Sequence, residues 1–238
     1  SRFYVQQRPS RSTTTALDHL RKSSISGTMR RVADDADQLE MFHFSPAFQV
    51  VVGPEFPGNG DWGCPVFCFG RDGRLQEPFD ARWGAPTIVE VTPHDGERWV
   101  GQFAAGGLGG ISGVFATPSP RLLCVVADGL AYLVGVDNAH RGADVVHDQV
   151  GQVEVVVEPA LLLLVRFIDI VAIGGDGVAW RSKRLAVDDL RVVSTSGGII
   201  QCSLDNLGGS PTIALDAATG EQRDGTRLDS IWPPDALA

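Results

Sequence analysis

The segment LLCVVADGLAY (residues 122–132) decides the fold class of this chain. Its apolar run enters an Asp-Gly pair and leaves through a small residue followed by an aromatic one. A second segment, IVAIGGDGVAW (residues 170–180), repeats this order at an offset of 48 residues, which is near the period of propeller blades. Because Asp-Gly suits the positive φ angles of a two-residue hairpin turn, both segments predict antiparallel hairpins.

The same pattern extends along the chain from Phe44 onward. Asp-Gly pairs also stand at residues 72–73 and 95–96, and apolar runs or period-two alternation lie between the turns. We expect strands at 48–52, 65–69, 87–91, 98–103, 122–126, 131–136, 152–157, 161–167, 168–173, 178–181, 190–193, 199–203 and 212–215. Their phases predict a core that contains Leu123, Val125, Val155, Leu162, Leu164, Ile170, Ile213 and Leu215.

These strands predict a mainly β domain over residues 44–230. An antiparallel β-sandwich or an open barrel of about ten to twelve strands fits the length, and propeller-like hairpin repeats are the alternative. The segment IALDAATGE (residues 213–221) resembles the strand-turn signature in the repeat blades of quinoprotein-type propellers. This resemblance spans nine of 238 residues and implies hairpin architecture. The other Asp-Gly spacings, 23 and 33 residues, make the repeat irregular.

The N-terminal region 1–43 differs from the domain that follows it. Residues 1–31 hold seven Lys/Arg and one acid, about +6, so the remaining 207 residues carry about −15 of the total charge of −9. Apolar residues then recur at spacings of three and four, which predicts an amphipathic helix over 26–42 and a shorter one near residue 16. A Pro-rich tail follows at residues 231–238.

A basic arm on an acidic domain predicts contact with an acidic partner. We expect the arm to clamp another protein subunit, with peripheral contact to anionic lipid or another acidic surface as a further expectation. The acidic domain itself is not expected to bind nucleic acid. The residues expected to bind the partner are Phe3, Tyr4, Arg8, Arg11, Leu17, Leu20, Arg21, Lys22, Arg30 and Arg31.

Neither a transmembrane segment nor a disulfide framework is expected. The longest uncharged run, 103–120, is interrupted by glycines and ends in prolines. The four cysteines are too few for a framework at this length, so free thiols in a reducing compartment inside the cell are expected, with a single Cys64–Cys68 or Cys124–Cys202 disulfide as the alternative. Because the arm is rich in Arg, Ser and Thr, poor in acids, and begins without Met, we expect a mitochondrial location after removal of a presequence, with the chloroplast as the alternative.

Four groups of residues could carry chemistry, and each has a structural explanation that we favour. Cys64 and Cys68 lack two further zinc ligands at a usable spacing, so no metal is expected. The polar segment around His140 and His147 fits a solvated loop. The glycines of 106–110 lack the Lys-Ser/Thr of a phosphate-binding loop, and no cofactor is expected. Arg181, with Lys183 and Arg184, fits a cross-strand ion-pair ladder or a contact with an acidic partner.

We therefore expect a non-catalytic accessory or structural subunit of a larger, organellar assembly, and no catalytic residues. The alternative is a free-standing ligand-binding or carbohydrate-active protein of sandwich or propeller type. Its site would lie among the loops 53–63, 104–120 and 137–149. Catalytic triads and nucleophile motifs are not recognisable in the sequence, which favours the subunit over an enzyme.

Overall fold

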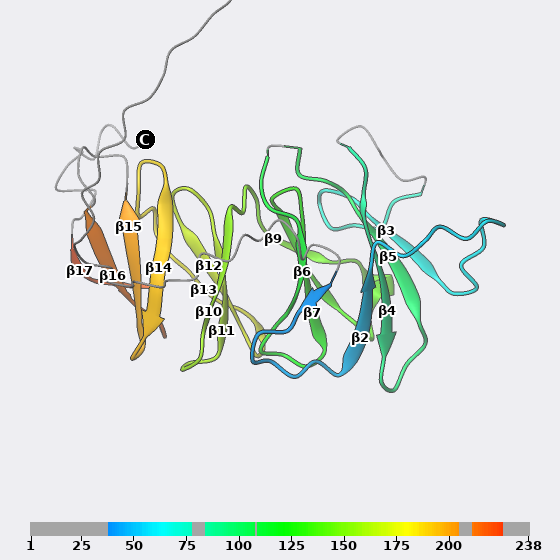
Figure 1. Cartoon of the computed structure of the whole chain (residues 1–238), viewed down its shortest axis with the longest axis horizontal. Helices are drawn as coiled ribbons and strands as arrows, with labels where there is room; N and C mark the ends of the chain where they lie inside the picture. The colour runs from blue at the N-terminus through cyan, green and yellow to red at the C-terminus, as the bar shows by residue number, and fades with distance from the viewer. Residues whose placement is uncertain (1–37, 78–83, 108, 205–210, 226–238) are drawn as a thin grey trace, which may run out of the picture. The chain divides into compact units, whose positions relative to one another are not determined.

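The computed structural model describes residues 38–77, 84–107, 109–204 and 211–225, which form four β-sheets (Figure 1). The mainly β fold with antiparallel sheets that the sequence predicts is confirmed. None of the four sheets closes into a barrel within these residues. Neighbouring sheets pack face to face, as the layers of a β-sandwich do.

The first and second sheets come from the N-terminal half of the described chain. The first sheet has the order β2-β4-β5-β3, and the second has the order β1-β6-β7-β8-β9. All their pairs are antiparallel except β3 with β5 and β1 with β6. The strands are β1 Leu39–Glu40, β2 Phe48–Val52, β3 Val66–Phe69, β4 Thr87–Pro93, β5 Trp99–Phe103, β6 Gly113–Ala116, β7 Leu122–Ala127, β8 Leu130–Gly135 and β9 Asp144–His147.

The third and fourth sheets are meanders, in which strands adjacent in sequence are also adjacent in space. The third has the order β10-β11-β12-β13 and the fourth β14-β15-β16-β17, and every pair is antiparallel. The strands are β10 Gln152–Val156, β11 Leu161–Val165, β12 Ile170–Gly174, β13 Gly177–Arg181, β14 Leu190–Ser196, β15 Ile199–Leu204, β16 Thr212–Asp216 and β17 Gln222–Gly225.

Three apolar cores join the sheets in sequence order: first to second, second to third, and third to fourth. The second and third sheets therefore have apolar neighbours on both faces. This explains why β11 reads as an unbroken run of buried Leu and Val, while β15 and β16 alternate. Of the predicted core residues, only Val155 is half-buried; the other seven are buried.

The hairpin turns follow the predicted chemistry most closely at Asp128-Gly129. These two residues join β7 directly to β8, with φ angles of 47° and 81°, as a type I′ turn requires. The Asp95-Gly96 pair lies in a longer loop between β4 and β5. In the segment 213–221, the carboxylate of Asp216 accepts hydrogen bonds from the backbone N–H groups of Ala218 and Thr219, which closes the turn after β16.

Two tryptophans make equivalent bridges between sheets. Trp99 of β5 donates through Nε1 to the carbonyl of Val136 at 2.9 Å, and Trp180 of β13 donates in the same way to Ala217 at 2.9 Å. In each case the acceptor lies 37 residues after the tryptophan, just beyond the third strand of the hairpin series in the next sheet. The contact between the first and second sheets is thus of the same kind as the contact between the third and fourth sheets.

Three local predictions need correction. Leu39 belongs to β1, paired with β6 in parallel, so the predicted helix 26–42 does not extend to its last residues. The segment 137–149 is not wholly a loop, because it contains a 3-10 helix, η2 Ala139–Arg141, and β9. Strands β6 and β17 were not predicted at all.

Residues 1–37 and 226–238 lie outside the described residues, and they include all ten predicted partner-binding residues and the C-terminal tail. No helix in the described ranges is both long and apolar enough to cross a lipid bilayer.

Candidate functional site

A charged cavity of about 610 Å³ lies where the second and third sheets meet, and a smaller one lies between the first and second sheets. Backbone structure determines which side chains line it. Strand β9 ends at His147, and β11 ends at Val165, where a tight turn closed by the Arg166 N–H and the Asp169 carbonyl at 3.0 Å leads into β12. The polar residues that line the cavity are Arg71, His147, Asp148, Arg166, Asp169, Arg181 and Ser182.

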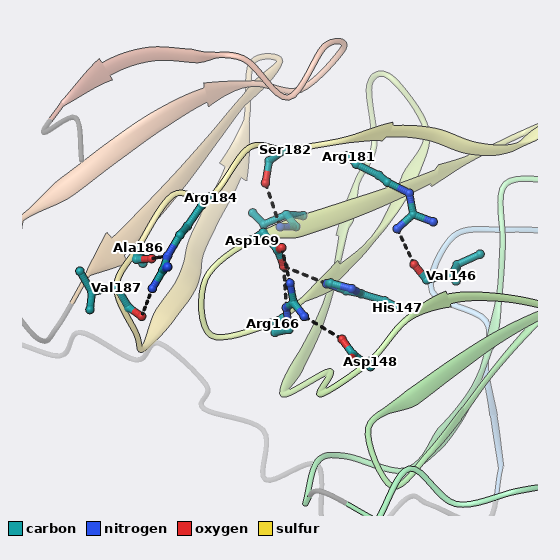
Figure 2. A network of polar contacts seen from close by, with 11 residues as sticks. Val146, His147, Asp148, Arg166, Asp169, Arg181, Ser182, Arg184, Ala186 and Val187 are labelled. Carbon is teal, nitrogen blue, oxygen red and sulfur yellow. Dashed lines mark hydrogen bonds and ion pairs between the residues drawn. The ribbon is translucent and has the colours of Figure 1, made fainter. Parts of the chain in front are cut away.

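The centre of this site is the carboxylate of Asp169 (Figure 2). Arg166 donates to it through two nitrogens, Nε to Oδ1 at 2.9 Å and Nη2 to Oδ2 at 2.6 Å. The third guanidinium nitrogen, Nη1, donates to Oδ1 of Asp148 at 2.8 Å. The Arg166 charge is therefore held between two aspartates, one of which follows directly after β9, so the ion pairs connect the second sheet to the third.

His147 approaches the same carboxylate from the second sheet. Its Nε2 lies 3.2 Å from Oδ1 of Asp169, and its side chain is 6% exposed. This nitrogen is not aligned for a hydrogen bond and has no other partner among the described residues. Although burial alone would raise the pKa of Asp169, the contacts with His147 and Arg166 lower it to about 2.

The outer part of the cavity is formed by the end of β13. Arg181 donates through Nη1 to the carbonyl of Val146 at 2.6 Å, which fixes its guanidinium beside β9. Within the described parts of the chain, Arg181 forms no ion pair with a carboxylate. The Oγ of Ser182 accepts the Ile170 N–H at 3.0 Å. Figure 2 shows the Arg181 side chain pointing toward the Val146 carbonyl, while His147 points toward Asp169.

A second cavity, of about 450 Å³, lies between the first and second sheets. Here Arg121 is bound by two aspartates, Asp137 at 2.6 Å and Asp95 at 3.1 Å. Glu97 and the aromatic side chains Phe67 and Trp99 also line it. The segment 137–149 contributes to both cavities, whereas the loops 53–63 and 104–120 line neither.

The four cysteines that the sequence singles out lie in buried or half-buried positions. All four cysteines are free, Cys124 and Cys202 being buried and Cys64 and Cys68 half-buried. Burial raises the pKa of each thiol, to about 12 for the two buried ones. In the described ranges, no three His, Cys, Asp or Glu side chains gather as a metal site would require.

The glycine-rich segment 106–110 packs on the hairpin of the second sheet. The N–H of Gly106 donates to the carbonyl of Ala127, and the N–H of Gly107 donates to the carboxylate of Asp128 at 2.8 Å. A Cβ at Gly106 or Gly110 would collide with backbone atoms of the turn, which explains why glycine is needed there.

The charged group at the end of β13 differs from the predicted ion-pair ladder. Arg181 and Arg184 both donate to backbone carbonyls, Arg184 to Ala186 at 3.0 Å and to Val187 at 3.1 Å. The Arg184 contacts lie in the segment between the third and fourth sheets, whereas the Arg181 contact joins β13 to β9. They leave the arginines' charge without a carboxylate partner among the described residues.

Sequence reasoning did not identify Arg166 and Asp169 as site residues. The available signal was their position: two opposite charges, three residues apart, directly after the most apolar strand of the chain. The prediction that His147 lies in a solvated loop is wrong, because His147 ends β9, where a shift in the register with β8 leaves both Val146 and His147 buried.

A comparison with known protein families finds no family that matches the chain, and a comparison with curated proteins finds no matching protein. The geometry of the two cavities and the charge of the chain are therefore the basis for any functional conclusion.

Proposed function

We propose that this chain is a non-catalytic accessory subunit, in which the β-sheets form a scaffold and the N-terminal arm holds a neighbouring protein subunit. The observation that carries the proposal is the state of Asp169, the most strongly perturbed acid of the larger cavity. Its oxygens accept both hydrogen bonds of the Arg166 fork and face His147. These groups connect two sheets of the chain, which is a structural role.

The chemistry of Asp169 does not suit proton transfer near neutral pH. General acids and bases work best when their pKa lies near the pH of the reaction. With a pKa of about 2, Asp169 stays ionised and holds its counter-ions. A carboxylate in this condition serves as a fixed negative charge that positions Arg166.

The alternative function, that of a carbohydrate-active protein, receives little support from the second cavity. Both aspartates there are bound to Arg121, and Trp99 is only 4% exposed, with its Nε1 occupied by a backbone carbonyl. A sugar-binding site usually offers an exposed aromatic face. The indole of Trp99 instead fills the core between the first and second sheets.

The contrast in charge supports the part of the proposal that concerns the arm. Exposed ion pairs contribute only about 0–1 kcal/mol each, whereas ordering the backbone of one residue costs roughly 1–2 kcal/mol. Attraction to the acidic sheets alone cannot order the arm, so we assign it a partner with apolar pockets for Phe3, Tyr4, Leu17 and Leu20. The four free cysteines support a reducing compartment, and we propose the mitochondrion, with the chloroplast as the alternative.

Deletion of residues 1–31 tests this proposal. The full chain and the truncated chain, each tagged at the C-terminus, are expressed in the source cells, and the native mass of each is measured by gel filtration. We expect the full chain in a larger complex and the truncated chain outside it, with the melting temperature of the purified protein unchanged. A third version, with the seven basic residues of 1–31 replaced by Gln at the same length, separates charge from chain length. A monomeric full chain contradicts the proposal, as does a large fall in melting temperature with the complex intact.

A further inference from the structure

The lining of the larger cavity is more basic than the rest of the domain. It contains three arginines and two aspartates, and also His147, although the residues after 31 carry about −15. Both aspartates are bound to Arg166, and neither forms an ion pair with Arg181. The charge of Arg181 therefore faces the cavity without a carboxylate partner among the described residues.

The hydrogen-bonding capacity of Arg181 is also incompletely used. A guanidinium has five N–H donors in a planar fork, and the contact with the Val146 carbonyl at 2.6 Å occupies Nη1. That contact holds the fork in place without neutralising it. The adjacent Ser182 receives the Ile170 N–H on its Oγ and keeps its hydroxyl proton for donation. His147, with a buried Nε2, lines the same cavity.

We propose that this cavity binds the oxyanion group, phosphate or carboxylate, of a small molecule, with Arg181 as its principal charged donor. Arginine binds such groups through paired hydrogen bonds because its fork matches two oxygens of the anion. The cavity volume of about 610 Å³ lies within the range of about 300–1,000 Å³ that is usual for small-molecule sites. This binding would be a property of the scaffold in addition to its proposed function as a subunit.

The second cavity provides a natural control within the same chain. Its lining holds two arginines but three acids, Asp95, Glu97 and Asp137. Arg121 is bound by two of these acids, just as Arg166 is bound by two aspartates in the larger cavity. The remaining arginine, Arg98, differs from Arg181 because it forms an ion pair with Glu90 at 3.3 Å. A cavity with this charge should repel an oxyanion.

The test is a titration of the full chain with inorganic phosphate, and separately with acetate, at constant ionic strength, followed by calorimetry and by the backbone amide shifts of Arg181 and Ser182. We expect saturable binding at one site with shifts at these amides. Arg181→Gln should weaken the affinity at least tenfold, which corresponds to about 1.4 kcal/mol. Arg181→Lys should restore part of it, and Arg121→Gln should leave it unchanged.

Two controls separate the cavity from other sources of binding. Removal of residues 1–31 should not change the affinity; if binding disappears with the arm, the basic arm holds the anion and the proposal is wrong. The unfolding midpoint of Arg181→Gln shows whether the variant is folded; if it is not, the partial loss of affinity expected of Arg181→Lys is measured in its place. Absence of saturable binding of both anions, or an equal loss in Arg121→Gln, overturns the proposal.

Discussion

The junction between the second and third sheets differs from the junctions on either side of it in the polar contacts that supplement its apolar core. At each flanking junction a tryptophan donates one hydrogen bond to a backbone carbonyl of the next sheet. At the central junction, ion pairs of Arg166 with Asp148 and Asp169, together with His147, make the connection. The Trp180 contact lies inside a packed core, whereas the Trp99 contact borders the second cavity, beside the ion pairs of Arg121. The ion pairs of Arg166 border the larger cavity.

This difference follows from what each contact requires. An indole N–H is neutral and needs one acceptor, so it can be enclosed by apolar side chains at little cost. Charges lose more solvation on burial and are retained where they are paired and partly hydrated. Both junctions that hold ion pairs therefore border a cavity, and the larger of these two cavities, at the central junction, is the one better suited to a ligand.

The largest effect is expected at the junction between the third and fourth sheets, from Gly220→Ala. Gly220 has a φ angle of 72°, and a Cβ there would collide with the indole ring of Trp180. Left-handed backbone costs alanine roughly 1–2 kcal/mol, and overpacking adds about 1–3 kcal/mol. Gly198→Ala is the matched control, because Gly198 has the same φ of 72° and no atom within 4 Å of its Cβ.

Urea unfolding of both glycine variants gives the result. We expect Gly220→Ala to lose more stability than Gly198→Ala by the overpacking cost alone. Equal losses would mean that the indole can move aside, and that the tryptophan contact does not fix the geometry of this junction.

A somewhat smaller effect is expected at the central junction, from Asp169→Asn. The change removes the negative charge between Arg166 and His147 but keeps the shape of the side chain. Loss of one member of a fully buried pair costs about 3–5 kcal/mol and of an exposed pair about 0–1 kcal/mol. The Arg166 and Asp169 side chains are 24% and 20% exposed, so we expect about 2 kcal/mol by urea unfolding.

Asp137→Asn in the second cavity is the counterpart of Asp169→Asn. Its partner Arg121 is 53% exposed and keeps a second contact with Asp95. We expect a loss below about 1 kcal/mol. If the two asparagine variants lose the same free energy of unfolding, the ion pairs of the central junction stabilise the fold no more than those at the surface. The scaffold role assigned to Asp169 then fails.

How far the sequence predicts this molecule depends on which contacts are local. The strands β2, β7 and β16 follow from runs and turns contained in a few residues, and their positions are predicted nearly to the residue. Strand β9 is missed because Asp144 and His147 make it resemble a polar loop, and β1 because Leu39 also fits a helical period. Strand β1 forms by pairing with the distant β6, and β9 by pairing with the preceding strand β8, so in both cases strand pairing outweighs the local pattern.

The site is predicted less well than the fold for the same reason. Arg166 and Asp169 are neighbours in one turn, and Arg181 lies near them because β13 pairs with β12. His147 joins them only because the second and third sheets pack face to face. That packing depends on the order of the sheets, which no local pattern encodes. The sequence alone shows the charges but not which of them meet.

The last effect concerns acid pH and tests the central junction without disturbing its packing. Contacts with His147 and Arg166, acting against burial, lower the pKa of Asp169 from 3.8 to about 2. A carboxyl whose pKa is lowered by folding adds stability above its unfolded pKa and loses it as the pH falls through the folded pKa. The ionised Asp169 carboxylate stabilises the fold by a little over 2 kcal/mol without solvent screening and by about 1 kcal/mol with it. This stabilisation should therefore disappear between about pH 4 and pH 2. Urea unfolding from pH 5 to pH 2 should show the free energies of wild type and Asp169→Asn approaching each other by about that amount, while the curve of the uncharged control Gly198→Ala stays parallel to wild type. A gap between wild type and Asp169→Asn that stays constant over this range would mean that Asp169 holds no charge-dependent contact, and that the central junction rests on packing alone.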